Sequence, residues 1–212
     1  DCQYKESWLT NKMKISEVLP IEELAKIDQN WIFHEKLEAV DYTDQELWQL
    51  YFILENKNDF MGPIPETWRN LKSLKFFSLA GNANIGGSLP DWLLNNLDSL
   101  QELTLSRCGL SGEIPPNVDQ MKSLRVLDLA ENSFSGVVPV ESLTRLRHLK
   151  HLRLAGNALT GSLHPSVAGL GEIETFDVSS NRLTGDLPKE LFSLPLLEIL
   201  DVSNNAFTGT LS

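Results

Sequence analysis

The chain has 212 residues, of which 42% are hydrophobic and 22% are charged, and its formal net charge at pH 7 is −11. This is the composition of an ordinary globular protein with enough apolar material for one continuous core. The acidic balance disfavours nucleic acid and anionic lipid as partners, and no run approaches the roughly 18 apolar residues of a membrane span.

Residues 1–46 differ in pattern from the rest of the chain. Residues 19–27 place a proline in a first helical turn and three aliphatic side chains on one face, which predicts a short helix. Thr43 and Glu46 have the spacing of a capping box at the start of a second helix. Because so short a segment rarely supports its own core, we interpret it as a helical N-terminal cap rather than a separate binding domain.

From residue 47 the sequence repeats with a period of about 24 residues. Each copy carries a series of apolar residues and, three positions after the last of them, an asparagine or its replacement. The copies centre on Asn58, Asn82, Cys108, Asn132, Asn157, Asn181 and Asn205. A period in the twenties with this internal spacing is typical of a solenoid, so we expect about seven repeats over residues 47–212. No C-terminal capping sequence follows the last copy, and we therefore expect further chain beyond Ser212.

The spacing inside a copy predicts one strand, followed by one asparagine that stacks on the asparagines of neighbouring copies to form a ladder. In Leu127-Asp128-Leu129 the two leucines alternate with a polar residue, so the leucines face the core and Asp128 faces solvent. Stacked copies then form one parallel sheet. The asparagine follows where the strand turns away, and its amide can pair with backbone groups that would otherwise be buried without partners. Cys108 interrupts this ladder, and we expect it to be a buried, unpaired thiol rather than the partner of Cys2.

Most copies continue with a G-x-[I/L/V]-P motif, as in residues 112–115 and 136–139. The motif predicts a turn, one buried aliphatic side chain and the end of strand pairing. In the fifth copy His164 replaces the proline. Segments such as 91–96 and 190–193 are expected to return along the outer side as short helical turns. The predicted fold class is therefore an α/β solenoid.

The unit L-x-x-L-x-x-L-x-L-x-x-N-x-L-[ST]-G-x-[IL]-P resembles the plant-type leucine-rich repeat. Residues 103–115 and 152–161 carry this resemblance, which extends over residues 47–212. Repeats of this type occur in plant receptor-like kinase ectodomains, receptor-like proteins and polygalacturonase inhibitors. The resemblance implies a right-handed arc with a concave parallel sheet, extra short strands beside it, and a role in binding proteins, peptides or small hormones. It also implies an extracellular or cell-surface location, with a secreted effector as the alternative.

No catalytic motif is present in the sequence: there is no phosphate-binding loop, no nucleophile elbow and no H-E-x-x-H. His148 and His151 lie in a segment expected to run from loop into strand, which disfavours a shared metal ion. Asp128, Asp177 and Asp201 align on successive copies, and solvent exposure explains them without a carboxylate site. We therefore predict no enzyme activity, no cofactor and no metal ion.

Any binding function is expected on side chains between the leucines, which fall into three zones along the chain. The first is aromatic, the centre is basic, and the last copies are acidic at Glu174, Asp177, Glu198 and Asp201. The candidate ligand-binding residues are Phe52 and Phe76 from the aromatic zone and Arg107, Arg125, Lys150, His151 and Arg153 from the basic centre.

Two interpretations of the basic centre remain open at this point. It can be an anchor for an acidic peptide, a carboxylate, or a sulfated or phosphorylated group. It can also be a solvated strand surface with cross-strand pairs to Asp128 and Glu131. Phe52 and Phe76 can equally pack beneath the N-terminal cap. The leading hypothesis is a non-enzymatic recognition module that binds a protein or peptide on the concave face. The alternatives are a structural or adhesion spacer within a larger surface protein, and an enzyme inhibitor or secreted effector that uses the same face.

Overall fold

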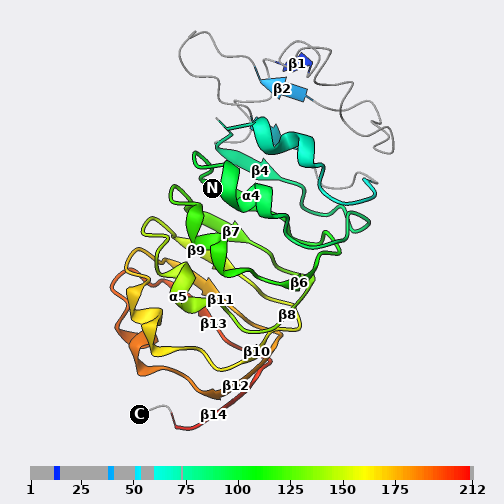
Figure 1. Ribbon diagram of the computed structural model, residues 1–212. Helices are drawn as coiled ribbons and strands as arrows, with labels where there is room; N and C mark the ends of the chain where they lie inside the picture. Colours follow the sequence, from blue (N-terminus) through cyan, green and yellow to red (C-terminus); the bar gives the residue numbers. More distant parts are fainter. Residues whose placement is uncertain (1–11, 15–37, 41–50, 54–59, 73, 211–212) are drawn as a thin grey trace.

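The computed structural model describes residues 12–14, 38–40, 51–53, 60–72 and 74–210 (Figure 1). Within these residues, one parallel sheet of seven strands runs the length of the repeats, and each predicted copy contributes one strand. Its strands, in sheet order, are β3 (Tyr51–Ile53), β4 (Phe76–Ser78), β5 (Glu102–Thr104), β7 (Val126–Asp128), β9 (His151–Arg153), β11 (Thr175–Asp177) and β13 (Ile199–Asp201). The expected solenoid with a parallel sheet is confirmed.

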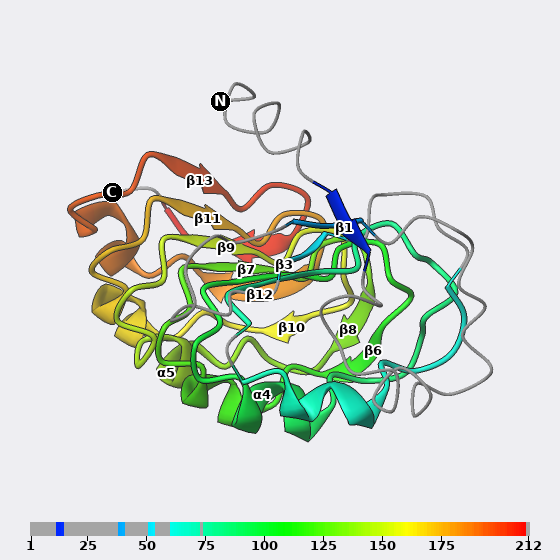
Figure 2. The same ribbon diagram turned by 90° about the horizontal axis from the view of Figure 1, so that it is seen from above.

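Short helices cover the side of the molecule opposite to this sheet (Figure 2). They are η1 (Glu66–Asn70), α4 (Asp91–Asn96), η2 (Pro116–Gln120), α5 (Val140–Leu143), η3 (Pro165–Gly169) and η4 (Lys189–Ser193). Five of these six begin directly after a proline, which ends the preceding extended segment and suits the entry to a helix. At η3, His164 replaces the proline and its side chain accepts a hydrogen bond from the Ser166 backbone N–H at 3.1 Å. The replacement residue thus caps the helix in another way.

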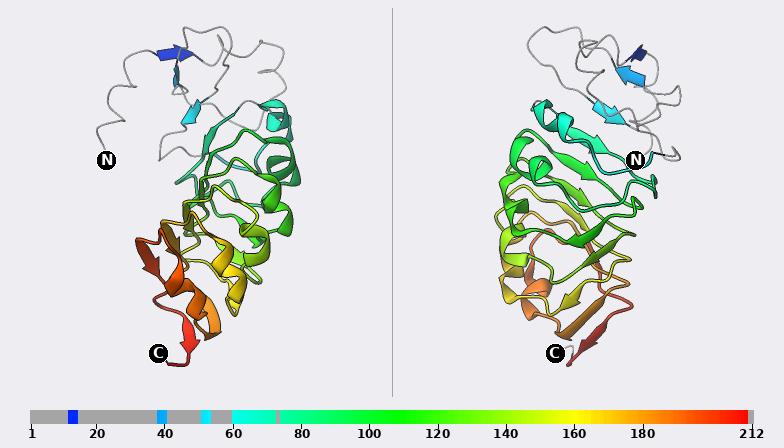
Figure 3. Two further views of the ribbon diagram at one scale, coloured as in Figure 1. Left: turned by 90° about the vertical axis from the view of Figure 1, so that its left-hand side faces the viewer. Right: turned by 45° about the vertical axis from the view of Figure 1, so that its right-hand side comes forward.

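Smaller sheets lie beside the main one, on the path from strand to helix (Figure 3). One pairs β6 (Ser111–Glu113) with β8 (Ser133–Ser135), and another has the order β10 (Thr160–Gly161), β12 (Arg182–Asp186), β14 (Ala206–Thr208). All of these pairings are parallel. The extra short strands implied by the resemblance are therefore present.

The core lies between the main sheet and the helices and is built from the apolar positions of the repeat. In β7, Leu127 is buried while Val126 and Asp128 on either side are half-buried, as period-two alternation requires. Large rings fill positions along the same core, with Phe77, Phe134 and Phe176 fully buried. One cluster of buried side chains runs from Phe60 to Leu194, so each copy is packed on its neighbours rather than on a centre of its own.

An asparagine ladder joins the turns that follow the strands. The Asn132 amide donates to Leu105 O at 2.8 Å, in the preceding copy, and its Oδ1 accepts from the backbone N–H groups of Cys108 and Leu110, both at 3.0 Å. Asn157, Asn181 and Asn205 repeat the donation to the preceding copy. Cys108 is a free, buried thiol that keeps the donor role, since its Sγ lies 3.1 Å from Leu79 O. The predicted role of the asparagine is confirmed.

The part of the chain before the repeats departs from expectation where it is described. β1 (Lys12–Lys14) pairs antiparallel with β2 (Glu38–Val40), a pairing that the sequence pattern did not indicate. The helices expected over 19–27 and after Thr43 lie outside the described residues.

The first copy is also aligned differently from the prediction. The repeat alignment places Phe52 beside Phe76, whereas β3 pairs with β4 so that Tyr51 is opposite Phe76 and Phe52 is opposite Phe77. A shift of one residue exchanges the two sides of a strand. By register Phe52 therefore belongs to the row of Phe77 and not to that of Phe76. Its place on the binding surface stays a prediction, because its side chain lies outside the described residues.

Candidate functional site

The candidate site is the face of the main sheet that points away from the core, here called the sheet face. Its residues flank the buried position of each strand and line up by strand register. One row is Phe76, Glu102, Val126, His151, Thr175 and Ile199, and the next is Ser78, Thr104, Asp128, Arg153, Asp177 and Asp201. From copy two onward the predicted rows are therefore confirmed.

The cations of the basic centre do not gather at one point. Arg125 and Lys150 precede their strands, and the backbone N–H of Lys150 donates to Arg125 O at 2.8 Å, so these residues are neighbours. Arg107 follows β5 and so lies toward the opposite end of the strands. The predicted basic centre is thus divided into Arg125 and Lys150 before the strands, His151 and Arg153 within β9, and Arg107 after β5.

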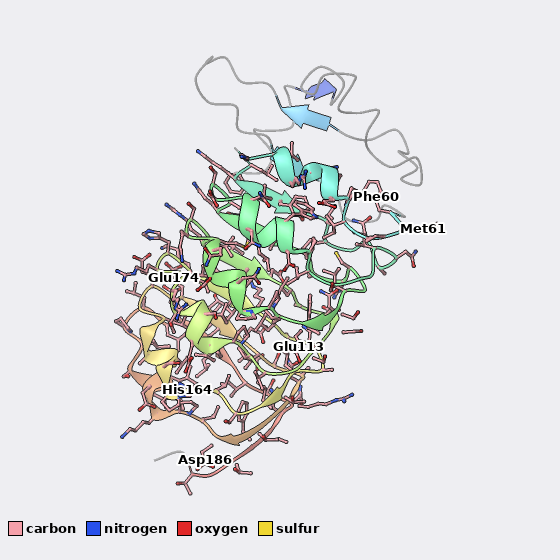
Figure 4. All side chains as sticks on the ribbon, in the orientation of Figure 1. Phe60, Met61, Glu113, His164, Glu174 and Asp186 are labelled. Atoms are coloured by element: carbon pink, nitrogen blue, oxygen red, sulfur yellow. The ribbon has the colours of Figure 1, made fainter. Side chains whose placement is uncertain are left out.

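Two of the cations are paired with glutamates one repeat further on. Arg107 donates two hydrogen bonds to Glu131, from Nε to Oε2 and from Nη2 to Oε1, both 2.6 Å long. Lys150 Nζ lies 2.5 Å from Oε1 of Glu174, the residue labelled in Figure 4. These partners hold the pKa of each glutamate carboxyl below its ordinary value, through the hydrogen bond first and the opposite charge after it. The pair of Arg107 with Glu131 is one that the second interpretation named, whereas the pair of Lys150 with Glu174 is not.

His151 and Arg153 lie side by side on the sheet face among groups of both charges. His151 Nδ1 is 3.1 Å from Thr175 Oγ1, and its Nε2 is 3.8 Å from Glu174 Oε2. Burial, followed by the neighbouring positive charge of Arg153, lowers the pKa of His151 below its ordinary value. The neutral imidazole is favoured at neutral pH, so His151 contributes a hydrogen-bonding ring rather than a charge.

The aligned aspartates have a structural role. Asp128, Asp177 and Asp201 each accept a hydrogen bond from the backbone N–H two residues further on, at 2.9–3.0 Å. This is the local bond by which aspartate stabilises a chain that leaves extended structure. Burial raises the pKa of Asp128, whereas the Ser203 hydrogen bonds lower the pKa of Asp201. The aligned carboxylates are therefore accounted for without a bound cation.

Arg125 and Phe76 are the two remaining candidates. Arg125 is exposed and has no ion pair among the described side chains. Phe76 is half-buried in β4, next to the strand that holds Phe52, whose side chain lies outside the described residues. Of the two glutamates that neutralise candidate residues, Glu131 was already named in the second interpretation, whereas Glu174 was not. The available signal was their spacing of 24 residues from Arg107 and Lys150, one full repeat.

In the described part of the chain, no group of three or more His, Cys, Asp and Glu side chains could hold a metal ion. Among these same residues, none of the helices has the length and apolar character needed to cross a membrane.

The profile of the Leucine Rich Repeat family matches residues 99–121, 123–144, 148–170 and 172–194. Receptor like protein 21 of Arabidopsis thaliana is 30% identical over 151 residues, which cover 65% of this chain and 15% of that protein.

Two solved ectodomains from Arabidopsis resemble the fold. That of the plant membrane receptor kinase GASSHO1/SCHENGEN3, in complex with CASPARIAN STRIP INTEGRITY FACTOR 2, has a TM-score of 0.71 and 30% identity, over 74% of this chain and 18% of that one. That of the receptor kinase HAESA, in complex with an N-terminally extended IDA peptide hormone, has a TM-score of 0.67 and 33% identity, over 72% and 25%. The chain therefore spans a small part of the proteins it matches.

Proposed function

Because the chain belongs to the plant-type leucine-rich repeat family, we propose that it is a non-enzymatic recognition module that binds a peptide or protein on its sheet face. The proposal places the protein outside the cell or at its surface, in keeping with the plant receptor-like proteins it resembles. The solved relatives in complex with a peptide hormone and with CASPARIAN STRIP INTEGRITY FACTOR 2 support a peptide as the ligand class.

The observation that carries the proposal is the uninterrupted register of the main sheet. From β4 to β13 every strand pairs in parallel with no shift, so alternate side chains form straight rows over several copies. An extended chain laid across these rows can contact several copies at once. Because the sheet is already ordered, it loses little conformational entropy on binding. Such a surface suits a peptide better than a small, enclosed ligand.

The charges of the sheet face indicate where an acidic group of the ligand would bind. Arg107 and Lys150 already hold carboxylates, so a ligand would have to displace Glu131 or Glu174 to reach them. Arg125 is exposed and has no such competitor in the described region. Arg153 lies between Asp128 and Asp177 in its row, in the middle of the face. We assign the anchor to Arg125, with Arg153 and the ring of His151 as secondary contacts and Phe76 as an apolar contact.

A peptide selection on the folded protein tests this assignment. Peptides selected from a random displayed library are synthesised, and their affinity is measured for the wild type and for the double variant Arg125→Glu/Arg153→Gln. We expect the double variant to bind at least about tenfold more weakly, because it removes the charge-assisted hydrogen bonds of the proposed anchor and of Arg153. The control is Lys189→Glu on η4, an exposed residue on the helical side, which should leave affinity unchanged.

Two outcomes would refute the proposal. Selected peptides that bind the double variant as well as the wild type would place their site elsewhere. Failure to select any peptide would favour the alternative of a structural or adhesion spacer.

A further inference from the structure

A second basic region lies where the chain passes from the helices to the strands. It is a hollow of about 440 Å³ lined by Lys122, Thr144, Arg145, Arg147 and His148. Lys122 lies between η2 and β7, and the other four lie between α5 and β9. Four of the five lining residues are basic, although the whole chain has a net charge of −11.

The hollow lies in the one strongly basic stretch of the described repeats. Residues 122–153 contain six lysines and arginines against three aspartates and glutamates, a net charge of +3. Like charges repel one another across a shared hollow, and an anion bound among them would relieve that repulsion.

Arg145 is held at the hollow by a carboxylate from the preceding copy. Its Nη1 lies 2.8 Å from Asp119 Oδ2, and the Asp119 side chain is only 8% exposed. Gln120 donates to the other oxygen of the same carboxylate at 2.6 Å. Hydrogen bonding to Arg145 holds the pKa of Asp119 below its ordinary value, so the pair is ionised at neutral pH. The guanidinium is thus positioned, and its remaining N–H groups are available to a ligand.

The other cations are less constrained. His148 Nδ1 lies 3.7 Å from Glu172 Oε2, a distance that leaves the ring able to contact a ligand. Lys122 and Arg147 have no ion pair with any described side chain. The Thr144 hydroxyl already donates to Glu141 O at 2.8 Å, so its proton is not available to a ligand. Donors on Lys122, Arg145 and Arg147 therefore have to be satisfied by water or by an oxyanion.

We propose that this hollow binds a small molecule through a phosphate or sulfate ester group. A tetrahedral oxyanion offers three or more acceptor oxygens, which matches two guanidinium groups and one ammonium better than a singly charged carboxylate does. The volume also exceeds that of one bound ion and falls within the range of pockets for small organic ligands. Phosphate and sulfate esters share this chemistry, and the experiment below distinguishes them.

Calorimetric titration with small esters tests the proposal. Glucose 6-phosphate, glucose 6-sulfate and uncharged glucose are titrated into the folded wild type at low salt. We expect one or both esters to bind with Kd of about 1 mM, and glucose not to bind, because the contact is carried by the anion. The variant Lys122→Gln/Arg147→Gln should weaken ester binding at least about tenfold.

The matched control is Lys72→Gln/Lys189→Gln, which removes the same two charges from exposed sites on other copies. It should change ester affinity by less than about twofold, since only the summed field of the protein is altered. Thermal unfolding of both double variants checks that each is folded.

The amide resonances show where the ester binds. Shifts that map to residues 122 and 144–148 support the site, and shifts that map to the sheet face refute it while leaving the proposed function intact. The proposal is also refuted by equal loss of affinity in the control, by absence of ester binding at ~10 mM, or by binding only to long polyanions.

Discussion

Asn132 is the position where the asparagine ladder should be most sensitive to substitution. In Asn132→Ala the Oδ1 acceptor and the Nδ2 donor are both lost. The backbone N–H groups of Cys108 and Leu110 and the carbonyl of Leu105 then have no other partner in the described structure. The two other carbonyls that Asn132 contacts, Leu129 O and Ala130 O, keep hydrogen bonds from elsewhere.

Three unpaired backbone groups set the expected cost of Asn132→Ala. A buried donor or acceptor without a partner costs about 1–3 kcal/mol, so we expect a loss of roughly 3–5 kcal/mol once partial hydration is allowed for. Asn157→Ala should cost about 1–3 kcal/mol, because only the Phe134 N–H loses its partner there. The two costs differ because Cys108 replaces the asparagine in its own copy. Asn132 therefore also serves the Cys108 N–H and the Leu105 carbonyl, which have no other partner in the described structure.

Urea unfolding followed by circular dichroism measures these changes. The control is Asn117→Ala, whose amide makes long contacts of 3.3 and 3.5 Å on the helical side and should cost less than about 0.5 kcal/mol. A cost for Asn132→Ala below about 1 kcal/mol, or one equal to that of Asn157→Ala, would refute the assignment of unpaired groups.

Three further predictions concern single positions. Ser180 has φ +53°, and Ser180→Gly should raise the unfolding free energy by about 0.5 kcal/mol in urea unfolding, because glycine adopts this conformation without strain; destabilisation would contradict this. Gly109→Ala should lower the unfolding free energy by about 2–4 kcal/mol, because φ is +67° and a Cβ would lie 2.3 Å from a backbone oxygen. The control Gly171→Ala has open space around it and should be neutral or stabilising, so equal effects of the two substitutions would contradict the prediction. Burial and Arg153 lower the pKa of His151, so on acidification the unfolded chain protonates this imidazole before the folded chain does. Stability should therefore fall as pH drops below 6.5, and thermal unfolding between pH 5 and 7.5 should show a smaller fall for His151→Gln.

Much of the candidate site could be placed from the sequence because the repeat converts spacing into position. From copy two onward, residues one repeat apart are neighbours in the main sheet, so the rows that contain His151 and Arg153 were predictable. The predicted alignment of the first copy was wrong by one residue, because Phe52 and the residues beside it are all apolar and period-two alternation cannot choose between them.

Pairing between side chains was less accessible from the sequence. Whether Arg107 reaches Glu131 depends on the backbone at both residues, which have φ of +57° and +55°. A left-handed conformation is uncommon for arginine or glutamate, so local preference gave no reason to expect it. The hollow around Arg145 was not accessible from the sequence either, because the position of the Arg145 side chain depends on Asp119 in the preceding copy.

The sequence alone therefore determined the solenoid, the residues of its core and the role of its asparagines, because each follows from local periodicity and from the need to pair buried backbone groups. Only the tertiary structure decided which charges on the surface are neutralised and which remain available. Arg107 and Arg125 are the same residue type at neighbouring copies, yet one is held by a carboxylate and the other is exposed without an ion pair in the described region. Charge pairing depends on the distance between side chains from different copies, and stacking alone brings those side chains together.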